Sequence, residues 1–301
     1  MIFVWLVITA GLFSAAALPI YREFKRRPKP KATPMAQLSE GATHYQWFGE
    51  EDGPVAVCVH GLSTPSIVYH DLAEELALMG YRVLIYDLYG RGASATPKKR
   101  QTPEFFAQQL TDLLADQGIT DDVTLFGYSM GGCIASHAAA ADPDRFRELI
   151  LLAPAGMTID LDRPTRWAVA TPLIGDWAFH LIYPRRLSDQ LKREAQSGSK
   201  PTAILDEQLA ELGRRGFVGS VLSSLRGTLR STQENTHRSL AATDLPVTAI
   251  WGRDDKVIPL RALGTLTQWN RNARQVVIDG AGHGLPHTHV DEIVVALEEE
   301  A

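Results

Sequence analysis

Cysteine is scarce in this chain: only two of its 301 residues are cysteines, Cys58 and Cys133. Two cysteines cannot form the disulfide framework on which small secreted domains depend. Cys58 lies in an apolar run and Cys133 in a run of small residues, so we expect both to be buried fillers, which suits a reducing compartment. One alternative stays open for Cys133, a modifiable thiol close to the motif described below.

A strong excess of one charge is also absent. Lys and Arg number 30 and Asp and Glu 35, so the formal net charge is −5, which argues against a nucleic-acid partner. The histidines and cysteines form no pattern typical of a zinc site, so we predict neither a metal nor a cofactor. Internal repeats are lacking, and the length suits one α/β domain with an insertion.

One long apolar run is present, at the start of the chain. Residues 1–21 carry no charged side chain, and about twenty such residues can cross a membrane as a helix. Basic residues follow in 22–31, so the pattern favours an uncleaved, single-pass anchor with the rest of the chain on the cytoplasmic side. The small residues at 14–17 leave open a cleaved, secreted form. The prolines that follow predict a basic tether over 22–44.

The most informative motif is a serine between two glycines. Gly127–Gly131 has the pattern G-x-S-x-G, follows the apolar run Val123–Phe126 and precedes the small residues of 132–141. This is the strand, turn and helix in which a nucleophilic serine stands on a sharp turn. Glycine suits that turn because a Cβ there would meet the neighbouring strand or helix.

An acidic residue and a histidine follow in an order that suits the serine. The apolar run Val247–Trp251 leads to Asp254 and Asp255, and a later run leads to His283. A serine hydroxyl becomes a nucleophile when a histidine takes its proton, and a carboxylate orients that histidine. Spacing alone leaves open which of the two aspartates would do so.

From about Gln46 to Val295 the chain resembles the α/β-hydrolase fold superfamily. Within it, the chain looks like the esterases and monoacylglycerol lipases that carry a membrane anchor and a helical cap. The resemblance implies an α/β fold with a mostly parallel, doubly wound sheet. It places the hydrolase core at 45–155 and 241–301 and a helical cap at 156–240.

The resemblance also assigns roles to individual residues. The superfamily pattern G-x-x-D-x-x-x-P fits Gly252 to Pro259 and selects Asp255 as the acid, with Ser129 as nucleophile and His283 as base.

A second set of motifs concerns the oxyanion hole. His60-Gly61-Leu62 matches the family's HG element, which implies that the backbone N–H groups of Leu62 and Met130 form the oxyanion hole. We expect His60 to be a structural histidine that holds this loop. The segment Asp87–Ser94 matches the D-x-x-G-x-G-x-S turn.

The cap would line the substrate pocket, because ligands bind at the carboxyl ends of the strands in open α/β sheets. We expect about half of its large apolar residues only to pack the cap. The candidates for an acyl pocket are Trp167, Ile174, Trp177, Phe179, Leu181, Ile182 and Phe217.

The predicted activity is hydrolysis of a carboxylic ester through an acyl-enzyme on Ser129. An anchor beside an apolar cap favours a lipid-like substrate, such as a monoacylglycerol or another single-chain ester. One alternative is a carbon–carbon bond hydrolase of ring-cleavage products, which shares the fold, cap and triad. Cofactor-free haloperoxidases share the triad too. From a different class, the fold could bind a ligand without catalysis. The sequence leaves the oligomeric state open.

Overall fold

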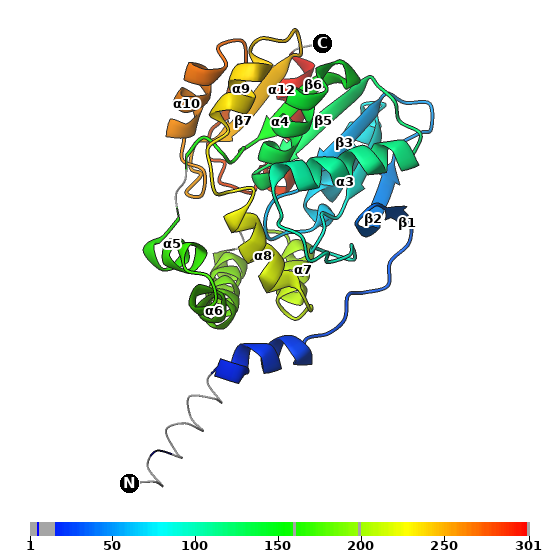
Figure 1. Ribbon diagram of the computed structural model, residues 1–301. Coiled ribbons are helices and arrows are strands. Elements are labelled where there is room, and N and C mark those ends of the chain that lie inside the picture. Colours follow the sequence, from blue (N-terminus) through cyan, green and yellow to red (C-terminus); the bar gives the residue numbers. More distant parts are fainter. Residues whose placement is uncertain (1–4, 6–15, 159–160, 198–199, 300–301) are drawn as a thin grey trace.

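The computed structural model describes residues 5, 16–158, 161–197 and 200–299 (Figure 1). Its eight strands form one sheet in the order β1-β2-β4-β3-β5-β6-β7-β8. The β1–β2 and β2–β4 pairs are antiparallel and the others are parallel, as predicted for a mostly parallel sheet. The strands are β1 (Met35–Leu38), β2 (Gly41–Phe48), β3 (Val55–Val59), β4 (Arg82–Tyr86), β5 (Val123–Tyr128), β6 (Phe146–Leu152), β7 (Val247–Gly252) and β8 (Arg274–Ile278).

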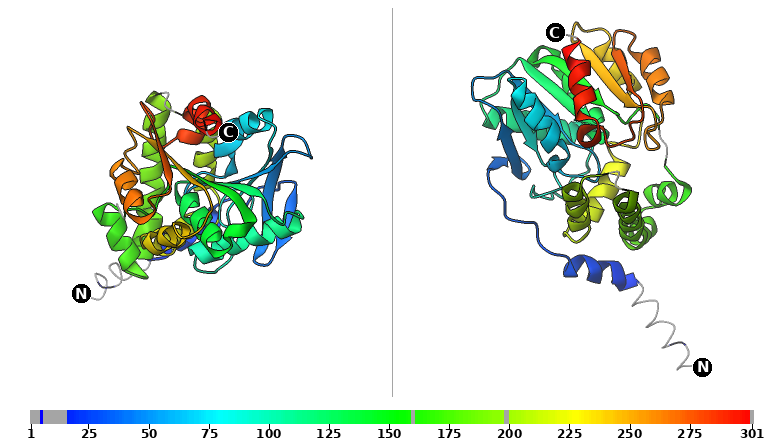
Figure 2. Two further views of the ribbon diagram at one scale, coloured as in Figure 1. Left: turned by 90° about the horizontal axis from the view of Figure 1, so that it is seen from above. Right: turned by 180° about the vertical axis from the view of Figure 1, so that it is seen from behind.

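The central strands are apolar on both sides because helices cover both faces of the sheet. Alternate residues of β3 show this: Val57 and Val59 belong to one buried cluster, and Ala56 and Cys58 to the other. The first face carries α3 (Pro103–Asp116), α4 (Met130–Ala141), α9 (Glu234–Leu240) and α10 (Arg261–Trp269). The second carries α2 (His70–Leu78), α11 (Leu285–Thr288) and α12 (Val290–Glu298), seen from behind in Figure 2. Short 3-10 turns lie at η1 (Ser66–Tyr69) and η2 (Pro143–Arg145).

Four inserted helices stand below the sheet in Figure 1 and have an apolar core of their own. They are α5 (Arg163–Ala170), α6 (Ile174–Ser197), α7 (Thr202–Leu212) and α8 (Phe217–Arg226), and we call them the cap. The predicted cap extends to residue 240 and so includes α9. In the structure α9 packs against α4 and α10, on the face of the sheet, because Leu240 is buried in the first cluster.

The segment before the sheet is attached to the cap. Residues 16–25 are helical and lie below α6 in Figure 1. Arg27 N–H donates to the carbonyl of Gly213 at 2.9 Å, and Arg215 N–H donates back to the carbonyl of Arg27 at 2.8 Å. The Glu23 carboxylate accepts from the backbone N–H of Gly216. The predicted tether over 22–44 is therefore docked in part, and it also contains β1 and the beginning of β2.

Among the described residues, no helix has both the length and the apolar character that a membrane span requires. Most of the expected anchor, residues 1–4 and 6–15, lies outside the described part of the chain. Its described end continues into Arg22, Glu23 and Lys25 within the same helix. The finding for the described residues contradicts the predicted single-pass membrane protein with its hydrolase domain on the cytoplasmic side.

Candidate active site

Ser129 stands between β5 and α4 in a backbone conformation that residues other than glycine rarely adopt, with φ 53° and ψ −117°. Such a conformation persists only where the surroundings impose it. The Ser129 N–H donates to the carbonyl of Leu152 at 3.0 Å, and the Ser129 carbonyl accepts from Ala155 N–H at 2.9 Å. The end of β6 and the loop that follows it thus hold the serine on its turn from both sides.

The two glycines of the motif are required by close backbone approach. A Cβ on Gly127 would lie 2.7 Å from the carbonyl oxygen of Gly131 and 2.8 Å from Cβ of Ala135. A Cβ on Gly131 would lie 2.0 Å from the carbonyl oxygen of Val59. The first turn of α4 therefore packs directly on the end of β3, which brings the residues after Val59 beside Ser129.

His283 bridges Ser129 and Asp255. Its Nε2 lies 3.0 Å from Ser129 Oγ and its Nδ1 lies 2.7 Å from Asp255 Oδ2. A carboxylate only accepts, so Nδ1 carries the proton and Nε2 is free to accept from the serine hydroxyl. The structure also separates the two adjacent aspartates, because Asp255 is buried at His283 and Asp254 is exposed.

His283 is held in addition by Tyr128, the residue before the serine. The Tyr128 hydroxyl donates to the backbone carbonyl of His283 at 2.8 Å, and the two rings lie 5.2 Å apart. Burial raises the pKa of Tyr128, so its hydroxyl stays protonated as a donor. Sequence reasoning missed this residue, since the motif leaves its position free.

Gly61 and Leu62 form the loop beside the serine. A Cβ on Gly61 would lie 3.3 Å from Cβ of Ser129, so this backbone passes in contact with Ser129. Met130 is the first residue of α4, where backbone N–H groups have no acceptor within the helix. Among the described residues, the Leu62 N–H has no hydrogen-bond acceptor either. Both groups are thus available to an oxygen atom on a substrate.

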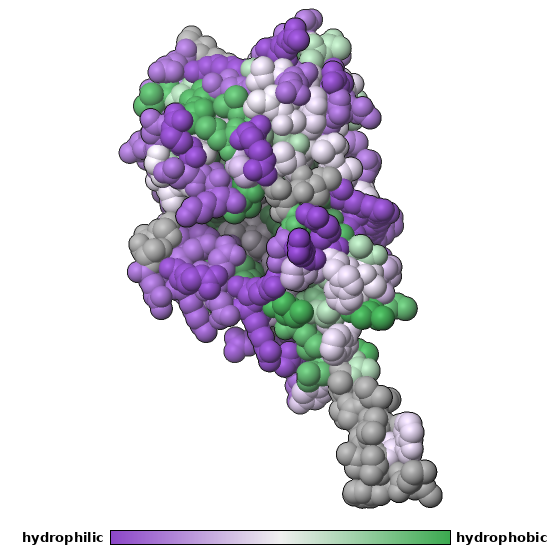
Figure 3. All heavy atoms as spheres, turned by 90° about the vertical axis from the view of Figure 1, so that its left-hand side faces the viewer, coloured by the Kyte–Doolittle hydropathy of each residue, from purple (hydrophilic) through white to green (hydrophobic). Residues whose placement is uncertain are grey.

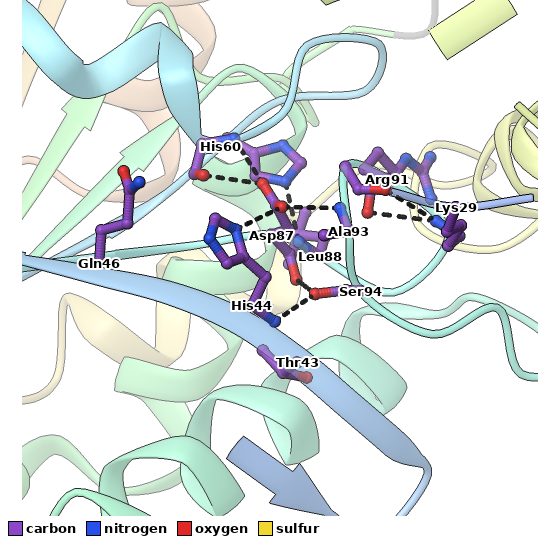
Figure 4. Close-up of polar contacts among 12 residues, drawn as sticks. Lys29, Thr43, His44, Gln46, His60, Asp87, Leu88, Arg91, Ala93 and Ser94 are labelled. Carbon is purple, nitrogen blue, oxygen red and sulfur yellow. Dashed lines mark hydrogen bonds and ion pairs between the residues drawn. The ribbon is translucent and has the colours of Figure 1, made fainter. Parts of the chain in front are cut away.

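His60 fixes this loop as a neutral side chain. Its Nε2 accepts from Leu88 N–H at 2.9 Å (Figure 4). Its Nδ1 therefore carries the proton and donates to the carbonyl of Gly61 at 2.9 Å. Burial lowers the pKa of His60 to about 4 despite the opposing effect of Asp87. Its two nitrogens are therefore engaged in holding backbone, as expected for a structural histidine.

Asp87 anchors the turn that faces His60. One carboxylate oxygen accepts from the N–H and hydroxyl of Ser66 at 3.0 and 2.7 Å. The other accepts from His44 Nδ1 at 2.9 Å and from Ala93 N–H at 3.0 Å (Figure 4). Burial alone would raise the pKa of Asp87, but the hydrogen bond from His44 and the nearby His60 bring it below its ordinary value. A Cβ on Gly92 would lie 2.1 Å from this carboxylate, which explains glycine in the turn.

The comparison with known families gives one decisive match: the model described as alpha/beta hydrolase fold covers residues 54–290. This chain belongs to the alpha/beta hydrolase fold family. A relative in Aliivibrio salmonicida, named pimeloyl-[acyl-carrier protein] methyl ester esterase, is 26% identical over 258 residues, which are 85% of this chain and 95% of that protein.

Solved structures share the fold of this alpha/beta hydrolase. An enol-lactonase from Burkholderia xenovorans has a TM-score of 0.71 at 21% identity and covers 88% of this chain and 98% of its own. A thermophilic esterase from Thermogutta terrifontis has a TM-score of 0.72 at 22% identity and covers 89% of this chain and 97% of its own. The specific resemblance to membrane-anchored monoacylglycerol lipases is not found, because these relatives are esterases of other kinds.

The predicted pocket residues of this hydrolase are spread through the cap. Ile174 and Trp177 line a groove of about 970 Å³ together with Leu173 and with Ile20 and Phe24 of the N-terminal segment. Apolar side chains gather at this junction in Figure 3. A smaller cavity, about 50 Å³, lies between α5 and α6 and is lined by Trp167, Phe179 and Ile182 among others.

Neither space is lined by a member of the Ser129–His283–Asp255 arrangement. Phe217 is buried in the apolar core of the cap, and Leu181 is half-buried. The described residues also contain no group of three or more His, Cys, Asp or Glu side chains that could hold a metal ion.

The two cysteines of this hydrolase are free and buried. Burial raises the pKa of Cys133 to about 12 and raises that of Cys58 as well. A thiol reacts through its thiolate, so neither residue has the character of a reactive cysteine. The structure therefore favours the interpretation that both cysteines only fill space in the apolar core.

Proposed function

We propose that this protein hydrolyses carboxylic esters through an acyl-enzyme on Ser129. The observation that carries the proposal is the continuous set of contacts from Ser129 Oγ to His283 Nε2, 3.0 Å, and from His283 Nδ1 to Asp255 Oδ2, 2.7 Å. Such a chain can activate a hydroxyl that is otherwise a poor nucleophile. It lies beside two backbone N–H groups that are free to receive a developing negative charge.

In the first half of the proposed reaction, Ser129 Oγ attacks the ester carbonyl while His283 Nε2 takes the hydroxyl proton. Asp255 keeps the imidazole in the required tautomer and stabilises its charged form. The N–H groups of Leu62 and Met130 donate to the carbonyl oxygen as it becomes an oxyanion. His283 then gives the proton to the leaving alcohol, and an acyl-enzyme remains.

In the second half, water takes the place of the alcohol. His283 takes a proton from water, which attacks the acyl carbonyl, and the same two N–H groups stabilise the second tetrahedral intermediate. Collapse of that intermediate breaks the bond to Ser129 Oγ, which regains its proton from His283. The free acid leaves, and no cofactor takes part in the scheme.

For the substrate we propose an ester with a single acyl chain, of which a monoacylglycerol is one example. Leu62, beside the nucleophile, packs against both the core of the sheet domain and the apolar core of the cap. The acyl side of a substrate at Ser129 would then lie next to apolar cap residues. The relative named for a methyl ester esterase supports an ester bond as the target. That the seven predicted pocket residues contact the chain stays a prediction.

The test is a series of p-nitrophenyl esters from acetate to palmitate, hydrolysed by the full chain. Activity that is lost in Ser129→Ala and is highest at medium or long chains would support the proposal. A maximum at acetate would keep ester hydrolysis but remove the single-chain lipid substrate. Absence of Ser129-dependent turnover on every ester would overturn the function itself.

A further inference from the structure

Arg91 is fully buried, and its guanidinium bonds to four oxygen atoms of neutral groups. Nε donates to the Leu62 carbonyl at 3.0 Å, and Nη2 donates to Ser224 Oγ at 2.8 Å. Nη1 donates to Gln101 Oε1 at 2.6 Å and to the Tyr89 carbonyl at 3.1 Å. A buried cation lowers stability unless its donors are satisfied, and here they connect three separate parts of the chain.

The first of these parts is the loop of the candidate oxyanion hole. The Leu62 N–H shares a peptide group with the Gly61 carbonyl, which accepts from His60 Nδ1 at 2.9 Å. The next peptide group contains the Leu62 carbonyl, which accepts from Arg91 Nε. The orientation of the Leu62 N–H is therefore fixed from both sides. A bond to the Gly61 carbonyl also polarises the N–H of the same peptide group.

The direction of this N–H matters because the loop is in contact with the nucleophile. A Cβ on Gly61 would lie 3.3 Å from Cβ of Ser129. Loss of the Arg91 bond would release the second peptide group, so that only His60 would hold the loop and the Leu62 N–H could shift from its position. Misplacement of a reacting or stabilising group by about 1 Å can cost about 100-fold in rate.

The second and third parts are the 101 loop and helix α8 of the cap. Ser224 Oγ donates to Gln101 Oε1 at 2.7 Å, and the Gln101 N–H donates to Ser223 Oγ at 3.1 Å. The Gln101 carbonyl accepts from Thr228 N–H at 3.0 Å. A displacement of α8 would therefore remove Ser224 from Arg91 and disturb Gln101 at the same time.

We propose that Arg91 is a positioning residue that couples the seating of α8 on the core to the orientation of the Leu62 N–H in the oxyanion hole. The inference rests on the proposed ester hydrolysis, in which that N–H stabilises the oxyanion. When α8 is seated, Arg91 holds the Leu62 carbonyl and the N–H points to the reacting oxygen. When α8 moves away, Arg91 loses an acceptor and the loop relaxes, so turnover is confined to the closed cap.

Two variants test the coupling from its two ends, and a third is the control. Ser224→Ala removes the cap acceptor and leaves the charge of Arg91, while Arg91→Lys keeps a charge but cannot reach all four acceptors. Ser223→Ala is the matched control, since it removes one hydroxyl of the same helix that bonds to the Gln101 N–H and not to Arg91, while the other contacts of α8 with this loop remain. We expect kcat to fall about 5-fold for Ser224→Ala and about 100-fold for Arg91→Lys, with KM within twofold. Ser223→Ala should keep kcat within twofold.

The readout specific to the oxyanion hole is the inhibition constant of an alkyl trifluoromethyl ketone, which forms a hemiketal oxyanion on the serine. It should rise in parallel with the loss of kcat across the variants, and thermal unfolding identifies any variant that fails to fold. Equal losses in Ser223→Ala and Ser224→Ala, or a change in KM alone, would overturn the role of Arg91. Ser224→Ala with wild-type kcat would do so as well. A folded wild type without Ser129-dependent turnover would instead overturn the proposed function.

Discussion

Asp254 and Asp255 are adjacent in the chain and differ in what surrounds them. The side chain of Asp255 is 1% exposed, and its Oδ1 accepts from the N–H groups of Val257 and Ile258 at 2.7 and 2.8 Å. These bonds leave Oδ2 directed at His283. The side chain of Asp254 is exposed, and its backbone N–H bonds to Ala281. Both residues are aspartates, so burial and backbone N–H donors, and not the residue type, decide which carboxylate contacts His283.

We expect Asp255→Asn to lower kcat by about 10⁴-fold on the best ester of the series, because an amide would hold His283 in the wrong tautomer. Asp254→Asn, one position away and exposed, should keep kcat within twofold. Steady-state kinetics of the two variants beside the wild type measures this. Similar losses in both would show that the carboxylate contact at His283 is not the one that matters.

Tyr128→Phe is the second change at the residue scale. The variant removes the hydroxyl that donates to the His283 carbonyl at 2.8 Å and keeps the ring against the imidazole. A hydrogen bond of this kind contributes about 1 kcal/mol, so we expect kcat to fall by up to about tenfold with KM unchanged. Single-turnover acylation of the variant checks this result. An unchanged acylation rate would mean that the loop after β8 is held well enough without Tyr128.

Helices α8 and α10 show at the element scale how surroundings decide what a glycine does. Gly227 ends α8, and a Cβ there would lie 2.0 Å from the carbonyl oxygen of Gln101. Gly264 lies inside α10, is exposed, and has no atom within 4 Å of an added Cβ. The first glycine lets the cap approach the core, and the second only leaves the helix backbone freer in the unfolded chain.

Gly264→Ala should therefore raise the free energy of unfolding by about 0.5–1 kcal/mol. Gly227→Ala should lower it by about 1–3 kcal/mol, because the backbone of the 101 loop must shift. Chemical denaturation of both variants measures the two changes. A stabilised Gly227→Ala would show that α8 does not pack on this loop as closely as the structure has it.

The whole molecule carries three buried histidines whose pKa values lie below the ordinary 6.5. Burial lowers the pKa of His60 and of His237 to about 4, and that of His287 to about 3. As the pH falls below 6.5, the unfolded chain takes up protons at these histidines while the folded chain does not. The folded state is therefore favoured above pH 6.5 and loses stability on acidification toward pH 4.

We expect the free energy of unfolding to rise with pH between about 4 and 6.5, by up to about 1.4 kcal/mol per pH unit for each of these histidines. His237→Phe should reduce this slope by up to about 1.4 kcal/mol per pH unit, since it removes one of the three histidines and the phenyl ring can keep the stacking on Trp269. Denaturation curves at several pH values test it, with pH 8 as the reference for each protein. A variant with the wild-type slope would contradict the assignment.

The fold and the members of the candidate site follow from local patterns in the chain. The apolar runs at β3, β4, β5, β6 and β7 and the sharp turn at Ser129 are local features, so the sequence predicted a mostly parallel sheet with a serine on a sharp turn between strand and helix. The motif order also pointed to Ser129, Asp255 and His283 before any distance was known. Strands and turns can be predicted from the sequence because their formation depends on residues that are neighbours in the chain.

The tertiary structure decided what no local pattern contains. The physical reason for Asp255 in place of Asp254 is burial, which only the structure shows. Tyr128 and Arg91 form hydrogen bonds with residues that lie 155 and 29 positions away in the chain. The apolar start of the chain predicted a membrane anchor, whereas no helix among the described residues has the length and apolar character of a membrane span. The sequence by itself determined the fold and pointed to the chemistry that we propose, since strands and turns are set by nearby residues. The orientation of each group was decided only when distant segments packed together.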